Sequence, residues 1–307
     1  MCILRIKPAL DRALEKNKKK FDLTSETKIV IFSDLHRGVG DWADDFMHNS
    51  LIFSSALDYY YTRKFTYVEL GDGDELYENR NLVDIARAHG NIFRQMDLFH
   101  KDNRMCFIAG NHNLQMTNKR WLQKALEEVQ ILIPDLFSGI EIFETAILGE
   151  KIFLFHGHQG DFINDTFVPF GRFWVRHIWR PLQNIFGFRD PTSPAQQVRK
   201  RNKVETGIIE WARDRHMVAI AGHTHRPMFL SLSKQQRLVG EPEEPYYFNS
   251  GCGIHPRSVT CIEIKEMTIE LVKWHIIADS QNDMRLKVMR EPSQGCQADL
   301  NDVIARL

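Results

Sequence analysis

The sequence predicts a layered α/β fold, and three observations point to it. Five short apolar runs, rich in β-branched and aromatic residues, are typical of strands that are buried on both faces. Amphipathic stretches of helical period lie between several of these runs, at 45–61, 81–100 and 118–132. Each of the five runs also stops at Asp, Asn or His. Strands that alternate with helices favour a sheet core covered by helices.

The predicted elements begin with a short polar helix over 8–20, which ends in Lys18, Lys19 and Lys20. A solvated helix face explains these lysines, and a membrane-surface contact is the alternative. The buried strands then follow in the order 28–32, 67–70, 105–109, 151–155 and 217–221.

The C-terminal part has a different pattern. Residues 258–264 and 268–277 flank a short turn and predict an antiparallel hairpin at an edge of the core. From about residue 279 the chain is polar and contains Pro292 and Gly295, which predicts a loose tail with a short terminal helix. The chain is therefore divided into three parts: an N-terminal helical extension (1–26), a main domain (27–278) and a polar tail (279–307).

The composition excludes several classes of protein. The 307 residues include 40 basic and 40 acidic side chains, and this zero balance argues against a generic polyanion binder and against nucleic acid as the partner. No apolar run reaches the ~18–20 residues of a membrane-spanning helix, and the N-terminus lacks the long apolar core of a signal peptide. The five cysteines are scattered without a C-x-x-C pair, which indicates reduced thiols in a cytoplasmic protein.

The polar residues that follow the five strands form a candidate metal-binding set. Each alone could merely cap a strand, but the carboxyl ends of strands in an α/β sheet meet where ligands bind. Two carboxylates, one amide and four imidazoles suit Mn, Fe, Zn or Ni better than Ca or Mg, and they are enough for two ions that share a carboxylate. Two such ions ~3.5–4 Å apart act as a clamp for displacement at phosphorus. The set consists of Asp34, His36, Asp72, Asn111, His156, His223 and His225.

The spacing within this set is informative. In D-x-H and G-H-x-H, alternate residues of an extended chain face the same way, so both side chains are expected on one side. The glycines before Asp72, Asn111 and His223 remove a side chain where the backbone must approach closely or turn sharply.

The motifs S-D-L-H, G-D, G-N-H, H-G-H and G-H-T-H, each following a strand in this order, resemble those of the calcineurin-like metallophosphoesterases over about residues 28–264. The resemblance implies a four-layer β-sandwich of two mixed sheets flanked by helices. It implies two divalent ions, with Mn expected first, and a hydroxide between them that attacks phosphorus. It also implies that His112 protonates the leaving oxygen or steadies the transition state. The implied ligands are Asp34, His36 and His225 for the first ion, Asn111, His156 and His223 for the second, and Asp72 for both.

The motifs depart from the family pattern after the G-N-H histidine. The family usually has Asp or Glu at the next position, where this chain has Asn113. Glu75, three residues after Asp72, is the candidate carboxylate to support His112 instead.

Three other side chains beside the motifs have two interpretations each. His158 either contacts substrate or the ligand shell, or is structural. Arg37 and Arg226 each follow a ligand motif, and either contact phosphate or belong to the solvated surface.

Residues 161–204 predict a helical insertion in which aromatic residues and arginines interleave, most densely over 167–189. Helices packed on the core with solvated arginines are one interpretation. A lid over the metals, or a peripheral membrane contact, is the other. The insertion and the motifs G-D-x-x-E and G-H-T-H-R-P resemble the branch of UDP-2,3-diacylglucosamine pyrophosphatases, except that Gly110-Asn111-His112 replaces that branch's G-N-R.

The function predicted from these features is hydrolysis of a phosphate monoester, diester or pyrophosphate. The substrate is expected to be a phosphorylated small molecule or a lipid-linked compound, and a nucleotide-lipid pyrophosphatase is one alternative. A non-catalytic scaffold on the same fold is another, although such scaffolds lose ligands and all seven are present here. A nuclease is the third, and the neutral charge balance weighs against it.

Overall fold

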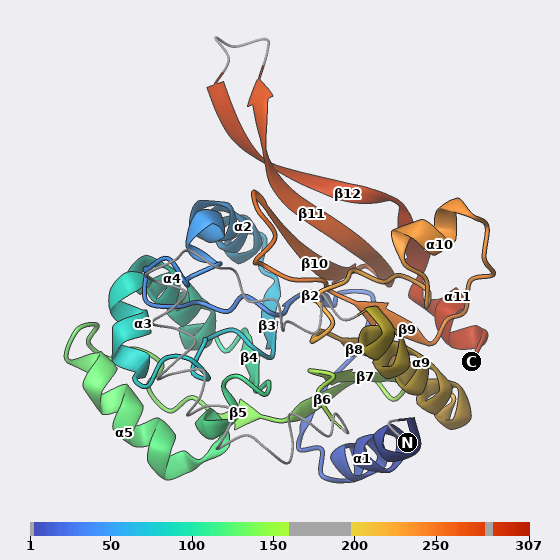
Figure 1. Ribbon diagram of the computed structural model, residues 1–307, viewed down its shortest axis with the longest axis horizontal. Coiled ribbons are helices and arrows are strands. Elements are labelled where there is room, and N and C mark those ends of the chain that lie inside the picture. Colours follow the sequence, from blue (N-terminus) through green and yellow to red (C-terminus); the bar gives the residue numbers. More distant parts are fainter. Residues whose placement is uncertain (1–2, 160–197, 280–284) are drawn as a thin grey trace.

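The computed structural model describes residues 3–159, 198–279 and 285–307, and within them two β-sheets lie face to face (Figure 1). The larger sheet has seven strands in the order β12 (Arg285–Asp299), β11 (Thr268–Asp279), β10 (Ser258–Lys265), β2 (Lys28–Phe32), β3 (Thr66–Leu70), β4 (Met105–Ile108) and β5 (Ile142–Phe143). The smaller sheet has five strands in the order β1 (Lys19–Phe21), β6 (Thr145–Leu148), β7 (Ile152–Phe155), β8 (Val218–Ala221) and β9 (Tyr247–Asn249).

Both sheets are mixed. In the larger one, β2 to β5 run parallel to one another, whereas β10, β11 and β12 pair antiparallel. In the smaller one, only the β6–β7 pair is antiparallel among the described strands. The parallel strands bring their carboxyl ends to the same edge of the molecule, and this edge positions the candidate site.

Helices cover the outer face of each sheet. The larger sheet is covered by α2 (Ser50–Thr62), α3 (Leu82–Ala88), α4 (Gly90–Lys101) and α5 (Lys119–Gln130), and the smaller by α1 (Ile3–Glu15) and α9 (Val198–Arg215). Shorter helical elements are η1 (Met47–Asn49), η2 (Leu114–Thr117), α10 (Lys234–Leu238) and α11 (Leu300–Ala305). The layers therefore follow the order helix, sheet, sheet, helix.

The apolar runs of the sequence fill two cores at once. In β2, Val30 and Phe32 pack among the helices, while Ile29 and Ile31 face the other sheet. Burial on both faces explains why the run has no polar alternation. The predicted architecture of two mixed sheets flanked by helices is confirmed, and all five predicted strands are present.

The N-terminal prediction is wrong in its boundaries. The helix α1 spans Ile3–Glu15, and Lys19 and Lys20 belong to strand β1, which pairs in parallel with β6. The apolar stripe of α1 starts at Ile6 and packs with Leu10 against α9, so the helix begins before the lysine-rich stretch. A solvated helix face therefore does not describe these lysines.

The predicted helix over 81–100 is divided into α3 and α4 at His89 and Gly90. The His89 ring is buried, with its Nε2 2.7 Å from Asp44 Oδ2, and Gly90 has a low helix propensity.

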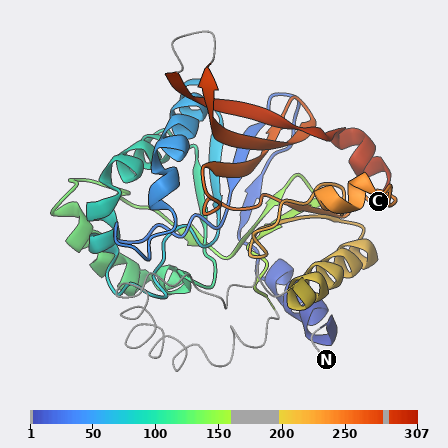
Figure 2. The same ribbon diagram turned by 45° about the horizontal axis from the view of Figure 1, so that its top comes forward.

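The predicted loose C-terminal tail is also wrong. The predicted antiparallel β10–β11 hairpin is present, but β12 pairs along β11, so β11 is not an edge strand. Arg290 of β12 reaches Glu263 and Glu270 on the neighbouring strands, and these ion pairs stabilise a polar strand that the hydrophobic pattern missed. The short terminal helix is confirmed as α11. Figure 2 shows the β11–β12 ribbon projecting beyond the body of the molecule.

Most of the predicted insertion lies outside the described residues, including all of 167–189; residues 198–204 form the first part of α9. Among the helices described, none has the length and apolar character needed to cross a bilayer. Cys106, Cys252, Cys261 and Cys296 are buried free thiols.

Candidate metal centre

The strand-end side chains converge at the carboxyl edge of both sheets. Within the described part of the chain, three groups of side chains have ligand atoms that all lie within 4.8 Å of one another. Asp72 belongs to two of these groups, as a carboxylate shared by two ions would. The groups are Asp34–His36–His225, Asp72–His156–His223 and His36–Asp72–His112.

The backbone at the ligands is left-handed rather than extended. The strands end at Phe32, Leu70 and Ala221, before the ligands begin, so the expected alternation of extended residues is not what aligns them. A left-handed residue other than glycine costs about 1–2 kcal/mol, and such strain concentrates at functional sites. Positive φ angles occur at Asp34 (52°), His36 (49°), Asp72 (50°), His223 (67°) and His225 (53°).

Glycines permit the close approach of these loops, as predicted. A Cβ on Gly110 would lie 2.1 Å from Asp72 Oδ1, and one on Gly222 would lie 2.4 Å from Asp34 Oδ2. Because no side chain fits at Gly110 or Gly222, the carboxylates of Asp72 and Asp34 can pack directly against the backbone of these glycines.

Asp34 is the centre of the first group. Its Oδ1 lies 3.1 Å from His225 Nε2, and its Oδ2 accepts a hydrogen bond from the His223 backbone N–H (2.9 Å). The His36 and His225 Nε2 atoms are 3.3 Å apart. Burial opposes the charge of Asp34, but His225 and His156 lower its pKa to about 2. Two imidazole nitrogens and an ionised carboxylate thus face one point, which suits a divalent cation.

Asp72 and His156 form the second group with His223. His156 Nε2 is 2.9 Å from Asp72 Oδ2, and the Nδ1 atom of the same ring donates to the Leu70 carbonyl (3.0 Å). Donation from Nδ1 leaves Nε2 with the lone pair that a metal needs. The Asn111 Oδ1 atom is buried without a hydrogen-bond partner among the described residues, so an acceptor oxygen is available at the same edge.

Glu75 joins His36 to His112. Its Oε2 lies 2.7 Å from the Nδ1 atom of each ring. This is the position expected of Glu75 if it supports His112 in place of an acid at residue 113. Burial lowers the pKa of His112, but the charges of Glu75 and Asp72 outweigh it and raise the pKa to about 10. Asn113 has a structural role instead, because its Oδ1 accepts the Gly110 N–H at 2.7 Å in the buried interior.

Arg37 fits neither interpretation made from the sequence. Its side chain is fully buried, so it neither contacts phosphate nor lies on a solvated surface. Its guanidinium pairs with Glu69 and Asp74, at 2.7–2.8 Å. Both carboxylates were missed, although Glu69 was a signal: it is the one charged residue in the apolar strand β3.

Arg226 and His158 lie next to residues of the three groups but belong to none of them. Arg226 is partly exposed and pairs with Glu205 of α9, which also accepts from the Thr224 hydroxyl at 3.0 Å. His158 packs near His156, with ring centroids 5.5 Å apart, and belongs to none of the three groups.

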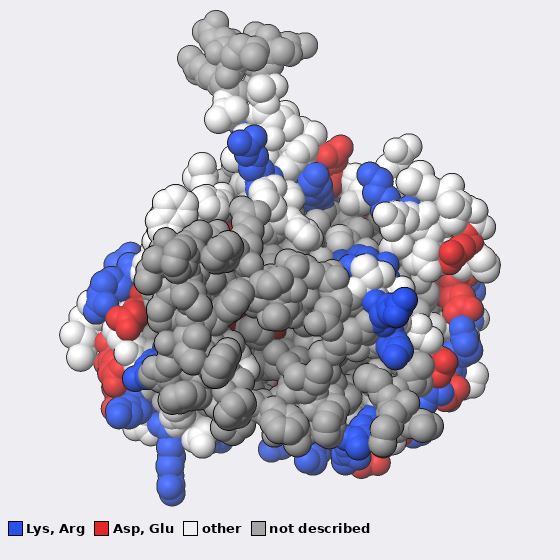
Figure 3. Space-filling model, viewed as in Figure 1, with Lys and Arg blue, Asp and Glu red and all other residues white. Residues whose placement is uncertain are grey.

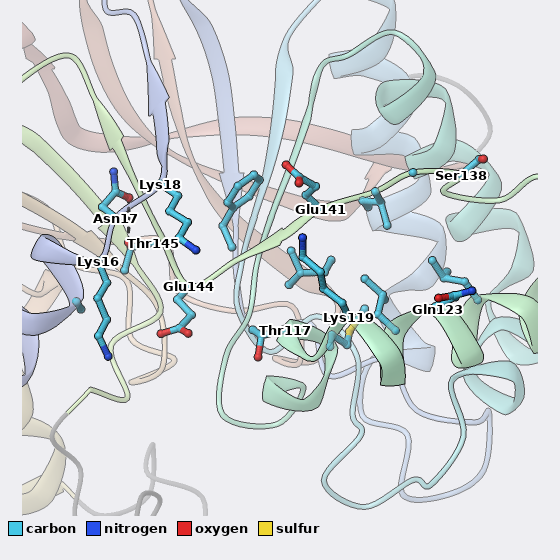
Figure 4. A pocket seen from close by; sticks show the side chains of 18 of the residues that line it. Lys16, Asn17, Lys18, Thr117, Lys119, Gln123, Ser138, Glu141, Glu144 and Thr145 are labelled. Atoms are coloured by element: carbon cyan, nitrogen blue, oxygen red, sulfur yellow. Dashed lines mark hydrogen bonds between the residues drawn. The ribbon is translucent and has the colours of Figure 1, made fainter.

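A separate groove of about 1160 Å³ lies between the α1–β1 connection, α5 and β5 (Figure 4). Lys16, Lys18 and Lys119 line it together with Glu141 and Glu144, and no residue of the three groups does. On the face shown in Figure 3, basic and acidic side chains are interspersed along both sides.

Comparisons with known proteins add little to this description. No family model matches the sequence, and no curated protein matches it. Among solved structures, the chain is similar to vacuolar protein sorting 29 from Cryptosporidium parvum at 13% identity and a TM-score of 0.37, covering 87% of this chain and 97% of that one. So distant a similarity supports no functional argument, and the description of the site rests on this chain's own residues.

Proposed function

We propose that this protein hydrolyses phosphate esters or anhydrides with two divalent ions, Mn²⁺ being the first choice. The observation that supports this is the pair of neighbouring His/Asp groups, with Asp72 beside both and a carboxylate-supported His112 at the same edge. In this proposal Asp34, His36 and His225 hold one ion, Asn111, His156 and His223 hold the other, and Asp72 contacts both.

The bound ions supply a water of lowered pKa as nucleophile and neutralise charge on the phosphoryl oxygens. The protein's own side chains orient the reaction. His112 is held at two points, because its backbone N–H donates to Asp72 Oδ1 (2.8 Å) and its Nδ1 faces Glu75. In this position the imidazolium donates a proton from Nε2 to the leaving oxygen. Arg226 is the proposed contact for a non-bridging phosphate oxygen, since it lies next to His225 and is partly exposed.

A scaffold role is less well supported. A binding surface needs neither a histidine held by a buried carboxylate nor Asp and His side chains on left-handed backbone, and this chain has both features.

A hydrolysis screen tests the proposal. The full chain is treated with a chelator, dialysed and assayed on p-nitrophenyl phosphate, bis(p-nitrophenyl) phosphate and a nucleoside-diphosphate lipid analogue, with and without added Mn²⁺. We expect hydrolysis of at least one substrate that disappears on chelation and returns with Mn²⁺. Failure to bind metal, together with no turnover of any of the three, would contradict the proposal.

A further inference from the structure

We propose that Arg37 is a positioning residue that sets the separation of the two loops carrying the metal ligands. These are the β2 loop, residues 33–37, and the β3 loop, residues 71–75. The inference rests on the proposed metal site. It assigns to this arginine a role in metal binding without any contact with metal or substrate.

The side chain of Arg37 crosses from the β2 loop to the β3 loop and to strand β3. Its Nε donates to Asp74 Oδ1 (2.8 Å), Nη1 donates to Glu69 Oε2 (2.8 Å) and Nη2 donates to Glu69 Oε1 (2.7 Å). The Tyr67 hydroxyl adds a donor to Glu69 Oε2 at 2.5 Å. All these side chains are buried. A planar fork held at both ends fixes orientation as well as distance.

The backbone of the two loops is joined at the same place. A ladder of hydrogen bonds extends the parallel β2–β3 pairing past the ends of both strands, and Arg37 and Asp74 form an isolated parallel bridge within it. The ladder thus aligns Asp34 and His36 with Asp72 and Glu75. Its bonds are Asp34 N to Gly71 O (3.0 Å), His36 N to Asp72 O (2.8 Å), Arg37 N to Gly73 O (2.8 Å) and Glu75 N to Arg37 O (3.0 Å).

Gly73 shows how tightly the arginine is enclosed. A Cβ at this position would lie 1.8 Å from Glu69 Oε1 and 2.8 Å from Arg37 Nη2. The residue between Asp72 and Asp74 must therefore be glycine for the Arg37–Glu69 pair to form beneath the ligand loop.

Stability alone is a weak reason for such a group. Burying one guanidinium and two carboxylates costs desolvation that their attraction often does not repay, and an apolar cluster of similar volume would serve a core as well or better. The pairs instead join the two ligand-bearing loops. Residues that orient metal ligands typically change metal affinity by ~10–100-fold when they are replaced.

The same sheet offers a matched control. Arg290 of β12 also forks onto two carboxylates, Glu263 and Glu270, at 2.5–2.7 Å. Its partners lie on β10 and β11 and belong to none of the three metal groups. Arg37→Lys and Arg290→Lys both keep the charge and lose the fork. Arg37 is fully buried between the two ligand loops, whereas Arg290 is partly exposed and joins strands away from them, so the thermal melts are compared together with the Mn²⁺ affinities.

The experiment measures Mn²⁺ binding by titration calorimetry on the metal-stripped full chain, and folding by circular dichroism and thermal melting. We expect Arg37→Lys to bind Mn²⁺ ~10-fold or more weakly than the unaltered protein, and Arg290→Lys to bind it with unchanged affinity. Glu69→Gln and its control Glu263→Gln make the same comparison of Mn²⁺ affinity by changing the carboxylate partner instead of the arginine. This second pair tests the inference if Arg37→Lys does not fold.

Unchanged Mn²⁺ affinity in folded Arg37→Lys, or in Glu69→Gln where the former does not fold, would overturn the inference. So would equal losses in the Arg37 and Arg290 variants, because the effect would then follow from general destabilisation. A lack of Mn²⁺ binding by the unaltered protein would be a different result: it would overturn the proposed function, and the inference with it.

Discussion

Two polar regions of the larger sheet differ from each other: the carboxyl ends of β2, β3 and β4, and the projecting strand β12. At the strand ends Asp34 and Asp72 are buried, the neighbouring histidines and Asn111 are partly buried, and several of these residues adopt left-handed backbone. On β12 they lie along a strand whose pairing with β11 shifts register near Glu270, and there Glu291 is half exposed and pairs with His275. Burying a polar side chain costs free energy that other interactions or a function must offset. An exposed polar side chain stays hydrated, and an ion pair adds little to its stability. The comparison favours the strand ends as the candidate functional site.

The largest effect is expected from Asp72→Ala, which removes the carboxylate shared by two of the metal groups at the strand ends. We expect turnover to fall by ~10³-fold or more, since charge stabilisation at phosphorus is lost, and bound metal to decrease. Metal analysis and initial rates measure both. Full activity in this variant would refute the shared-ligand role.

His112→Ala separates chemistry from metal binding. We expect the rate to fall ~10²–10⁴-fold, the usual contribution of a general acid, while the metal content stays unchanged. The loss should be greater for an alkyl phosphate than for p-nitrophenyl phosphate, because a poor leaving group needs the proton more. A large loss of metal would instead make His112 a ligand.

Glu75→Gln tests the link between His36 and His112. The amide keeps the shape of the side chain but weakens the hydrogen bond to each ring, so we expect a ~10–100-fold lower rate and weaker metal binding. Glu75→Asp, which retains the charge on a shorter chain, should recover part of the rate. If Glu75→Gln matched the unaltered protein in rate and affinity, the joint support of the two rings would be disproved.

The smallest effect is expected on the ribbon. Glu291→Gln removes the half-exposed carboxylate that pairs with His275, and we expect less than ~0.5 kcal/mol of lost stability with no change in rate. Chemical denaturation and the Mn²⁺-dependent assay measure the two quantities. A loss of activity here would show that the ribbon takes part in function and would remove the contrast with the strand ends.

Several features could be predicted because they depend on local order in the sequence. The strand over 28–32 was identified from its continuous apolar run, and the ligands beyond it from residue type and position. Glu75 was identified as the support for His112 because the usual acid was missing at Asn113. The strand β12 was missed because its sequence is polar, and the ion pairs of its Arg290 with Glu263 and Glu270 form only when the strands come together. The boundaries of the first helix were wrong and strand β1 was missed for a similar reason, since α1 packs against α9 and β1 pairs with β6.

By itself, the sequence determined the α/β alternation, the five strands and the set of polar residues that follows them, since hydrophobic period and residue chemistry are local properties. The tertiary structure alone decided that Asp34, His36 and Asp72 face one another from left-handed turns rather than from extended strands. It also decided that Arg37 is a buried clamp on Glu69 and Asp74 rather than a surface charge. The reason is that burial and charge pairing depend on which residues fold together, and these partners lie more than thirty positions away along the chain.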